Sequence, residues 1–334
     1  MDISGYNQLI PHVASSKKYY VISIEGCKLN RYSNEAGRYI RRIMPILPRG
    51  IPFLTSRHYT NPLAELYASS LPGDIIHHIN ADDSFFLHGM LRFKKKKRLV
   101  ATIHQPLKIF KEIMPSTWRR YFRRLDALIT IASREYKYFK KALPGVKVVH
   151  IPHGNNNQHF KGSSLNEKVG ICIGGWQRDH ETILKAMKIV KHHHPEFILY
   201  IINRRKPAEY GKTDSNVQFR INIPDSQLLD FYREAAMCVL PLKDCTANNA
   251  ILEALASGIP VITNYVGGVR DYTDIKCASY FKPRDHDDLA AKIISVLDSK
   301  KKLKKMSQAA LKRSRQYDWD LITEKIKTEV YVQT

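Results

Sequence analysis

A polar loop followed by a helix start carries the residues best suited to bind an anionic ligand. An apolar run ends at Pro241, a polar stretch follows, and a helix is expected to open at Asn248 and Asn249. The unpaired N–H groups and the dipole at a helix start attract phosphate. Glu253 stands in the first turns, where a carboxylate can accept two hydrogen bonds from a vicinal diol such as ribose. Each residue alone is also typical of an ordinary α/β loop, but their order favours a binding site.

That loop reads D-C-T-A-N-N-A-I-L-E from Asp244 to Glu253 and resembles the donor-binding stretch of retaining glycosyltransferases of family 4. It is most similar to a bacterial branch in which the loop reads D-x-T-A-N-N-x-x-L-E. Five other segments resemble motifs of this family and occur in the same order as those motifs. They are Val100–Pro106, Ile131–Ser133, His150–Gly154, Gly174–His180 and Tyr317–Trp319. Each segment is weak evidence alone; together they indicate the family and say nothing of the sugar.

The resemblance implies an α/β protein of the GT-B fold, with two Rossmann-like lobes, parallel sheets and a C-terminal helix that crosses back. We expect an acceptor-binding lobe over residues 1–155 and a nucleotide-sugar donor lobe over residues 156–316. Residues 317–334 are expected to form a terminal helix that packs on the first lobe. Short apolar runs that alternate with amphipathic stretches support this organisation, since the pattern is typical of parallel sheets covered by helices.

In the first half the alternation predicts five strands and two clear helices. The strands are Tyr19–Ile24, Asp74–Ile79, Leu99–Ile103, Ala127–Ile131 and Val146–Ile151, and the helices are Asn34–Met44 and Ser133–Leu143. Residues 155–168 are polar, with three consecutive asparagines and a Gly-Ser-Ser, and are predicted to link the lobes.

In the second half the alternation begins again. The predicted strands are Val169–Ile173, Phe197–Ile202, Cys238–Pro241 and Pro260–Thr263. The predicted helices are His180–Lys191, Asp225–Ala236, Asn249–Ser257, Asp287–Leu297, Lys302–Gln316 and a last one from about Asp318.

The resemblance also implies roles for residues of the donor lobe. Glu253 matches the glutamate that holds the donor ribose, and Arg178 matches the basic residue that neutralises the departing phosphate. The family's other glutamate is replaced by Cys245, and the neighbouring Asp244 could supply the missing carboxylate. The remaining donor-binding candidates are Gly174, Gly175, Trp176, Thr246, Asn248, Asn249 and Ala250, of which the last three match the helix-start amides under the diphosphate.

Breaking a glycosyl–phosphate bond builds negative charge on the leaving diphosphate. A preorganised cation and helix amides stabilise that charge more in the transition state than in the ground state. We therefore expect a metal-independent transfer without a cofactor, in which the nucleotide sugar is a substrate and UDP is preferred to GDP. The resemblance implies that His104 contacts the transferred sugar by its backbone or ring. The alternative for His104 is a buried histidine at a strand end.

The acceptor side is less well defined by the sequence. Gly5 and Tyr6 resemble an element of the same branch that follows a glycine-rich turn after the first strand, yet only four residues precede Gly5. Three explanations stay open: the chain is truncated, it begins at a late start codon, or it has lost this first strand. Asp82 and Asp83 follow a predicted strand and its His77-His78 pair, and they are candidates for facing the acceptor.

The charge is strongly positive and unevenly placed. The chain has 54 Lys and Arg against 31 Asp and Glu, and residues 1–160 alone hold 26 against 10. Such a field attracts nucleic acid, anionic lipid or phosphorylated substrates. One basic segment interleaves aromatic side chains with arginines, as an interfacial helix does, so we consider membrane contact there. Its residues are Trp118, Arg119, Arg120, Tyr121, Phe122 and Arg123. The same pattern suits RNA, or a soluble surface.

The sequence shows no run of about 20 apolar residues and no signal-peptide pattern. Five scattered cysteines fit reduced thiols better than a disulfide framework. We therefore expect a cytoplasmic enzyme, peripheral on the inner face of the plasma membrane, that transfers sugar to a saccharide or lipid-linked acceptor in bacterial surface polysaccharide or glycolipid synthesis. The alternatives are a sugar-nucleotide epimerase, a basic RNA-binding module and a catalytically silent paralogue of the same fold.

Overall fold

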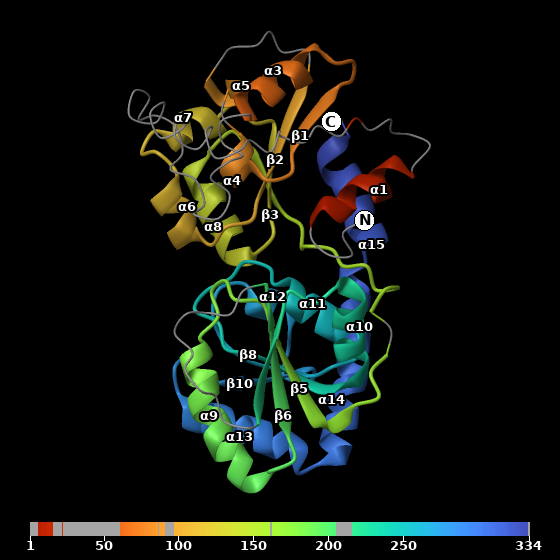
Figure 1. The fold of residues 1–334 in the computed structure, drawn as a ribbon. Coiled ribbons are helices and arrows are strands. Elements are labelled where there is room, and N and C mark those ends of the chain that lie inside the picture. Colours follow the sequence, from red (N-terminus) through yellow and green to blue (C-terminus); the bar gives the residue numbers. More distant parts are fainter. Residues whose placement is uncertain are drawn as a thin grey trace. The chain divides into compact units, whose positions relative to one another are not determined.

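A computed structural model describes residues 6–15, 22, 61–85, 87–90, 97–160, 162–204 and 216–332. The chain divides into two compact units (Figure 1). Unit 1 comprises Met1–Gln8 and His153–Leu321, and unit 2 comprises Leu9–Pro152 and Ile322–Thr334. The chain therefore passes from unit 1 into unit 2 after Gln8 and returns to unit 1 after Pro152. It enters unit 2 again after Leu321, within its last α-helix.

Unit 1 is built on a six-stranded sheet whose printed strand pairs are all parallel. Its strands are β5 (Asn166–Ile173), β6 (Ile198–Asn203), β7 (Val217–Ile221), β8 (Ala235–Leu240), β9 (Val261–Asn264) and β10 (Ala278–Phe281). The order across the sheet is β7-β6-β5-β8-β9-β10. This is the Rossmann order, in which the direction of winding reverses between the first and fourth strands, here β5 and β8.

The helices of unit 1 follow its strands along the chain and cover the sheet. They are α9 (His180–His193), α10 (Asp225–Glu234), α11 (Asn249–Ala256), α12 (Val269–Tyr272), α13 (His286–Leu297) and α14 (Lys300–Ser314). Three of them begin at side-chain caps, because Asp179, Asp285 and Ser299 each accept a backbone N–H from the first turn. Helices α9 and α13 pack on each other, as do α11 and α14 (Figure 1).

Unit 2 contains a parallel sheet with the order β1-β2-β3-β4. Its strands are β1 (Ile75–His78), β2 (Arg98–Ile103), β3 (Ala127–Thr130) and β4 (Lys147–His150). Its helices are α1 (Leu9–Ala14), α3 (Asn61–Ser70), α4 (Ala81–Ser84), α5 (Leu87–Met90), α6 (Leu107–Ile113), α7 (Trp118–Phe122) and α8 (Ser133–Ala142). Aromatic rings dominate its core, where Phe110 meets Trp118, Phe122 and Phe139 edge to face.

Two segments contact each other in unit 1, one where the chain enters this unit and one where it leaves. They are residues 154–155 and 317–319. Gly154 lies so close to Trp319 that a Cβ atom would stand 2.3 Å from the indole ring. The next residue, Asn155, exchanges backbone hydrogen bonds with Tyr317 and Trp319 at 2.6 and 3.2 Å. Trp319 opens α15 (Trp319–Ile326), which a π-helical turn, Lys327–Tyr331, continues. A 3-10 helix, Arg315–Tyr317, precedes α15, and another, Tyr6–Gln8, precedes α1.

The predicted strands and helices that fall on described residues are confirmed, with ends shifted by a few residues. Strands β5 and β8 each begin three residues earlier than predicted, so Ala235 and Ala236 belong to β8 and not to the preceding helix. The short strands β7 and β10 are not predicted from the sequence. The predicted strand Tyr19–Ile24, apart from Ile22, and the predicted helix Asn34–Met44 lie outside the described residues, as does Cys27. The other four cysteines are buried thiols that form no disulfide with one another.

Candidate functional site

The reversal of strand order in unit 1 places two loops side by side. In open α/β sheets ligands bind at the carboxyl ends of the strands where the winding reverses. The loops that follow β5 and β8 meet here, because Asp179 N donates to Pro241 O at 2.9 Å and Lys243 N donates to Gln177 O at 2.9 Å. The two predicted donor segments, separated by about 70 residues of sequence, therefore form one contiguous surface.

Arg178 connects these two loops through its side chain. Its Nε donates to Ile173 O at 3.0 Å and its Nη1 to Trp176 O at 3.2 Å. Its Nη2 donates to Asn248 Oδ1 at 3.2 Å. Gly174 makes room for this guanidinium, since its φ of +84° suits glycine and a Cβ there would lie 3.4 Å from Nη2. The cation is thus fixed at the start of helix α11 before any ligand arrives.

Helix α11 begins at Asn248, whose side chain does not cap the helix. Its carbonyl accepts from Ile251 N and Leu252 N, at 3.0 and 3.2 Å, while its Oδ1 faces Arg178. The first amides of a helix have no carbonyl within the helix to bind, and Asn249 and Ala250 carry those amides here. A guanidinium beside these N–H groups forms a site for a phosphate or diphosphate.

Glu253 is buried one turn further along α11, with 4% of its surface exposed. Its Oε2 accepts a hydrogen bond of 2.6 Å from the hydroxyl of Tyr232, which belongs to α10. Burial, and then the adjacent Glu253, raise the pKa of Tyr232 well above its usual value, so this hydroxyl keeps its proton and donates. Sequence reasoning did not find Tyr232, because no local motif links residues of two different helices.

The loop after β8 is hydrogen-bonded to the turn after β9. Gly268 N donates to Cys245 O at 2.9 Å, and Asp244 Oδ1 accepts from Cys245 N at 2.8 Å. A Cβ on Gly267, whose φ is +50°, would stand 1.8 Å from Cys245 O. Cys245 and Thr246 are buried in the loop after β8. Trp176, in the loop after β5, is 45% exposed.

In unit 2 His104 and Asp82 are joined by a hydrogen bond. Asp82 is buried and accepts from the backbone N–H groups of His104, at 2.6 Å, and Gln105, at 3.3 Å. The His104 ring donates through Nε2 to Ile79 O at 2.6 Å. Burial lowers the pKa of His104 to about 4, so its ring is neutral at physiological pH. Asp82 thus holds the backbone of the His104 loop, and its predicted place on the acceptor side stays a prediction.

Tyr6, which is predicted on the acceptor side, belongs to unit 1. It is buried there, and its ring meets His153 and Trp319 edge to face with centroids 5.3 Å apart in both pairs. A ring packed in this way stabilises the fold. Gly5 lies outside the described residues, and so does the side chain of Asp83, although its backbone belongs to α4.

The predicted membrane contact of the aromatic side chains at α7 is contradicted by their burial. Trp118, Tyr121 and Phe122 are at most 9% exposed and belong to the core of unit 2, so they cannot insert into a bilayer from the folded state. The alternation of rings and arginines reflects a short helix with one face in the core. Arg119, Arg120 and Arg123 are exposed. Among the residues that the structure describes, no helix is long and apolar enough to cross a membrane.

The loops after β5 and β8, helix α11 and Glu253 all lie in one segment of the chain that is similar to known proteins. Residues 167–299 match the family model described as glycosyl transferases, group 1. The match covers β5 to α13 and therefore most of unit 1.

Curated relatives align over a similar length. Sulfoquinovosyl transferase SQD2 of Arabidopsis thaliana is 28% identical over 117 residues, which are 34% of this chain and 23% of that protein. Glycogen synthase of Mycobacterium tuberculosis is 31% identical over 107 residues, which are 30% of this chain and 25% of that protein. The chain thus aligns with about a quarter of the length of the curated relatives it matches.

Solved structures are similar over most of the chain. Sucrose-phosphate synthase (tll1590) from Thermosynechococcus elongatus has a TM-score of 0.66 at 18% identity, over 85% of this chain and 81% of that one. Anabaena Alr3699/HepE, solved in complex with UDP and glucose, has a TM-score of 0.65 at 14% identity, over 82% of each chain. The fold is therefore the GT-B fold that the motif order predicts.

Proposed function

We propose that this chain is a glycosyltransferase that moves a sugar from a nucleoside diphosphate donor to a saccharide or lipid-linked acceptor, with the anomeric configuration retained. The observation that carries the proposal is the hydrogen bond from Arg178 to Asn248 at the point where the strand order reverses. It fixes a cation against the amino end of α11, in the segment that matches group 1 glycosyl transferases. That pair suits the two phosphates of a nucleotide sugar.

In this proposal each group acts on a different part of the donor. Arg178 and the amides of Asn249 and Ala250 stabilise the charge that develops on the leaving diphosphate. Glu253, held by Tyr232, accepts the ribose hydroxyls, and Asp244 takes the place of the carboxylate missing at Cys245. His104 contacts the transferred sugar, and its low pKa makes it a neutral hydrogen-bonding group and not a cation.

UDP is proposed as the preferred nucleotide, with GDP second. Anabaena HepE was solved with UDP and glucose, and a pneumococcal O-GlcNAc transferase, GtfA, was solved with UDP and GlcNAc. These proteins are 14% and 18% identical to this chain, so they support the choice of nucleotide only through the shared fold. The exposed arginines of α7 are proposed to bring the enzyme to an anionic membrane surface, where lipid-linked acceptors reside.

The test is a donor-hydrolysis screen over UDP- and GDP-sugars, each with and without a chelator. We expect release of UDP from one UDP-sugar, unaffected by the chelator, and its loss in Arg178→Ala. Calorimetric titration with UDP and GDP accompanies the screen, because binding and turnover are separate properties. Binding without turnover of any donor would favour a catalytically silent paralogue, and binding of neither nucleotide would remove the proposal.

A further inference from the structure

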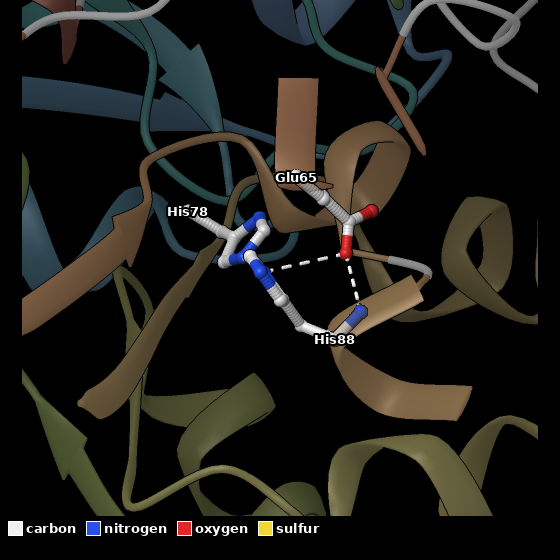
Figure 2. A group of neighbouring side chains, drawn as sticks. All are labelled: Glu65, His78 and His88. Atoms are coloured by element: carbon white, nitrogen blue, oxygen red, sulfur yellow. Dashed lines mark hydrogen bonds and ion pairs between the residues drawn. The ribbon is translucent and has the colours of Figure 1, made fainter. Parts of the chain in front are cut away.

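Three buried polar side chains of unit 2 converge from three different elements. Glu65 lies on α3, His78 ends β1 and His88 lies on α5, and their exposed fractions are 4%, 8% and 2%. One potential ligand atom from each lies within 4.8 Å of the others. Figure 2 shows the two imidazole rings and the carboxylate directed toward a common point. Neither the donor site nor the group 1 match, which begins at residue 167, involves this cluster.

The hydrogen bonds around His88 establish which ring nitrogen carries its proton. The Ser69 hydroxyl donates to Glu65 O at 3.0 Å, so it accepts from His88 Nε2 at 2.7 Å. A neutral His88 then has its lone pair on Nδ1, which faces His78 Nε2 at 2.8 Å and Glu65 Oε2 at 3.4 Å. The backbone N–H of His88 also donates to Glu65 Oε2, which fixes the carboxylate beside that lone pair (Figure 2).

Two imidazoles and a carboxylate that converge on one point are ligand types that bind divalent transition metals. We propose that Glu65, His78 and His88 bind one divalent transition-metal ion, with zinc the best match. Zinc takes His nitrogen and carboxylate oxygen at about 2.0–2.2 Å in a tetrahedron, so its ligand atoms stand about 3.3 Å apart. The Glu65–His88 distance of 3.4 Å fits that spacing. The His78–His88 contact of 2.8 Å has to open by about half an ångström, as a hydrogen bond becomes a shared ligand pair.

The surroundings hold the proposed ligands in place. The Lys97 ammonium would oppose a cation at the site, but it is held by hydrogen bonds to the carbonyls of Ala68 and Leu71. Ser69, bound to the other nitrogen of His88, supplies the outer contact that orients a ligating histidine.

The ion would join helices α3 and α5 to the end of β1. The residue after His78 is Ile79, whose carbonyl accepts from the His104 ring at 2.6 Å. The metal therefore acts as a structural link behind the His104 loop and takes no part in glycosyl transfer. Consequently the ion belongs to the folded state of unit 2, and its binding is testable without any donor or acceptor.

The experiment measures zinc binding by a chain that lacks a competing histidine cluster. The exposed His192 and His193 end α9, beside His194, and could bind zinc adventitiously. We use the variant His192→Ala/His193→Ala as the background, strip it with a chelator, and titrate Zn²⁺ by calorimetry. Metal content by mass spectrometry, the visible spectrum with Co²⁺, and the melting temperature with and without Zn²⁺ complete the measurement.

We expect one equivalent of zinc per chain, a tetrahedral cobalt spectrum and a higher melting temperature with zinc, since the ion binds the folded state. His88→Gln should abolish the cobalt spectrum. Ser69→Ala keeps all three ligands and should weaken zinc binding by about 10- to 100-fold, so it decides the matter even if His88→Gln does not fold. Absence of zinc binding in the background variant, or equal affinity in the background, His88→Gln and Ser69→Ala proteins, would overturn the proposal.

Discussion

Arg178 Nη2 donates a hydrogen bond to Asn248 Oδ1 at 3.2 Å, joining the loop after β5 to the helix start after β8. Because Nε and Nη1 are already bound to the carbonyls of Ile173 and Trp176, the guanidinium needs little rearrangement to meet a phosphate. Preorganised charge of this kind stabilises a transition state more than a mobile side chain does. The role proposed for Arg178 is therefore in the chemical step as well as in binding.

Replacing Arg178 by Ala should lower kcat of donor turnover by about 10²- to 10³-fold, with a smaller rise in KM. Arg178→Lys should retain part of the rate because it keeps the positive charge. It should not restore the full rate, because lysine lacks the planar guanidinium that three hydrogen bonds hold in place. Arg233→Ala, which removes an exposed arginine paired with Asp230 on α10, is the control and should have no effect. Equal losses in kcat and in donor affinity would instead assign Arg178 to binding or folding.

Glu253→Gln should weaken UDP binding by about 1.5–3 kcal/mol while the fold is kept, since a charged hydrogen-bond partner of the ribose is lost. Tyr232→Phe removes the hydrogen bond that holds this carboxylate and should weaken UDP binding to a smaller extent. Tyr200→Phe, in strand β6 of the same unit, serves as the control. Calorimetric titration measures all three, and unchanged affinity in Glu253→Gln would place the ribose elsewhere.

Gly267→Ala tests the contact between the turn after β9 and the loop after β8. The new Cβ would stand 1.8 Å from Cys245 O, so the two loops must separate. Gly162→Ala is a matched control, because Gly162 has a similar φ of +54° with nothing within 4 Å of a Cβ. Both variants carry the backbone strain of about 1–2 kcal/mol, and Gly267→Ala should lose about 1–3 kcal/mol more in denaturant unfolding. Equal losses would show that the loops separate freely.

The order of motifs was enough to predict the GT-B fold, and it also placed Arg178 and Asn248 in loops that the structure brings together. It could not find Tyr232, because the pairing with Glu253 depends on how α10 packs against α11. It also misassigned Trp118, Tyr121 and Phe122. An interfacial helix and a short core helix share one alternation of rings and arginines, and only the tertiary fold decides which face is buried.

Buried histidines give the stability a defined pH dependence. Burial lowers the pKa of His104 and of His180 to about 4 from an ordinary value of 6.5. Each therefore binds a proton more readily in the unfolded chain, so stability is full above about pH 6.5 and falls as the pH drops toward 4. The midpoint of urea unfolding should follow this course, and His180→Gln should flatten it by up to one proton. A midpoint independent of pH over this window would contradict the low pKa values.

Arg119 and Arg120 on α7, and Arg123 directly after it, are exposed. With Trp118, Tyr121 and Phe122 in the core, attraction to a membrane must be electrostatic, so it should require anionic lipid and disappear at high salt. Arg119→Ser/Arg120→Ser/Arg123→Ser should weaken binding to anionic liposomes by up to roughly 100-fold, given about 1 kcal/mol for each arginine near the surface. The control Lys301→Ser/Lys304→Ser/Lys305→Ser removes the same charge from exposed positions on α14 and should bind as the unmodified chain does.

Trp118→Ser separates this mechanism from insertion of aromatic side chains. Loss of a buried indole should destabilise the fold by about 3–5 kcal/mol, whereas an inserting residue would lower liposome binding and leave the melting temperature unchanged. Sedimentation with anionic and neutral liposomes and thermal unfolding distinguish the two. Equal loss of binding in the arginine and lysine variants would mean that total charge, and not the α7 surface, attracts the chain. Tight binding to RNA at physiological salt without recruitment to liposomes would assign the arginines to nucleic acid, and the donor site around Arg178 and Glu253 would be unaffected by that result.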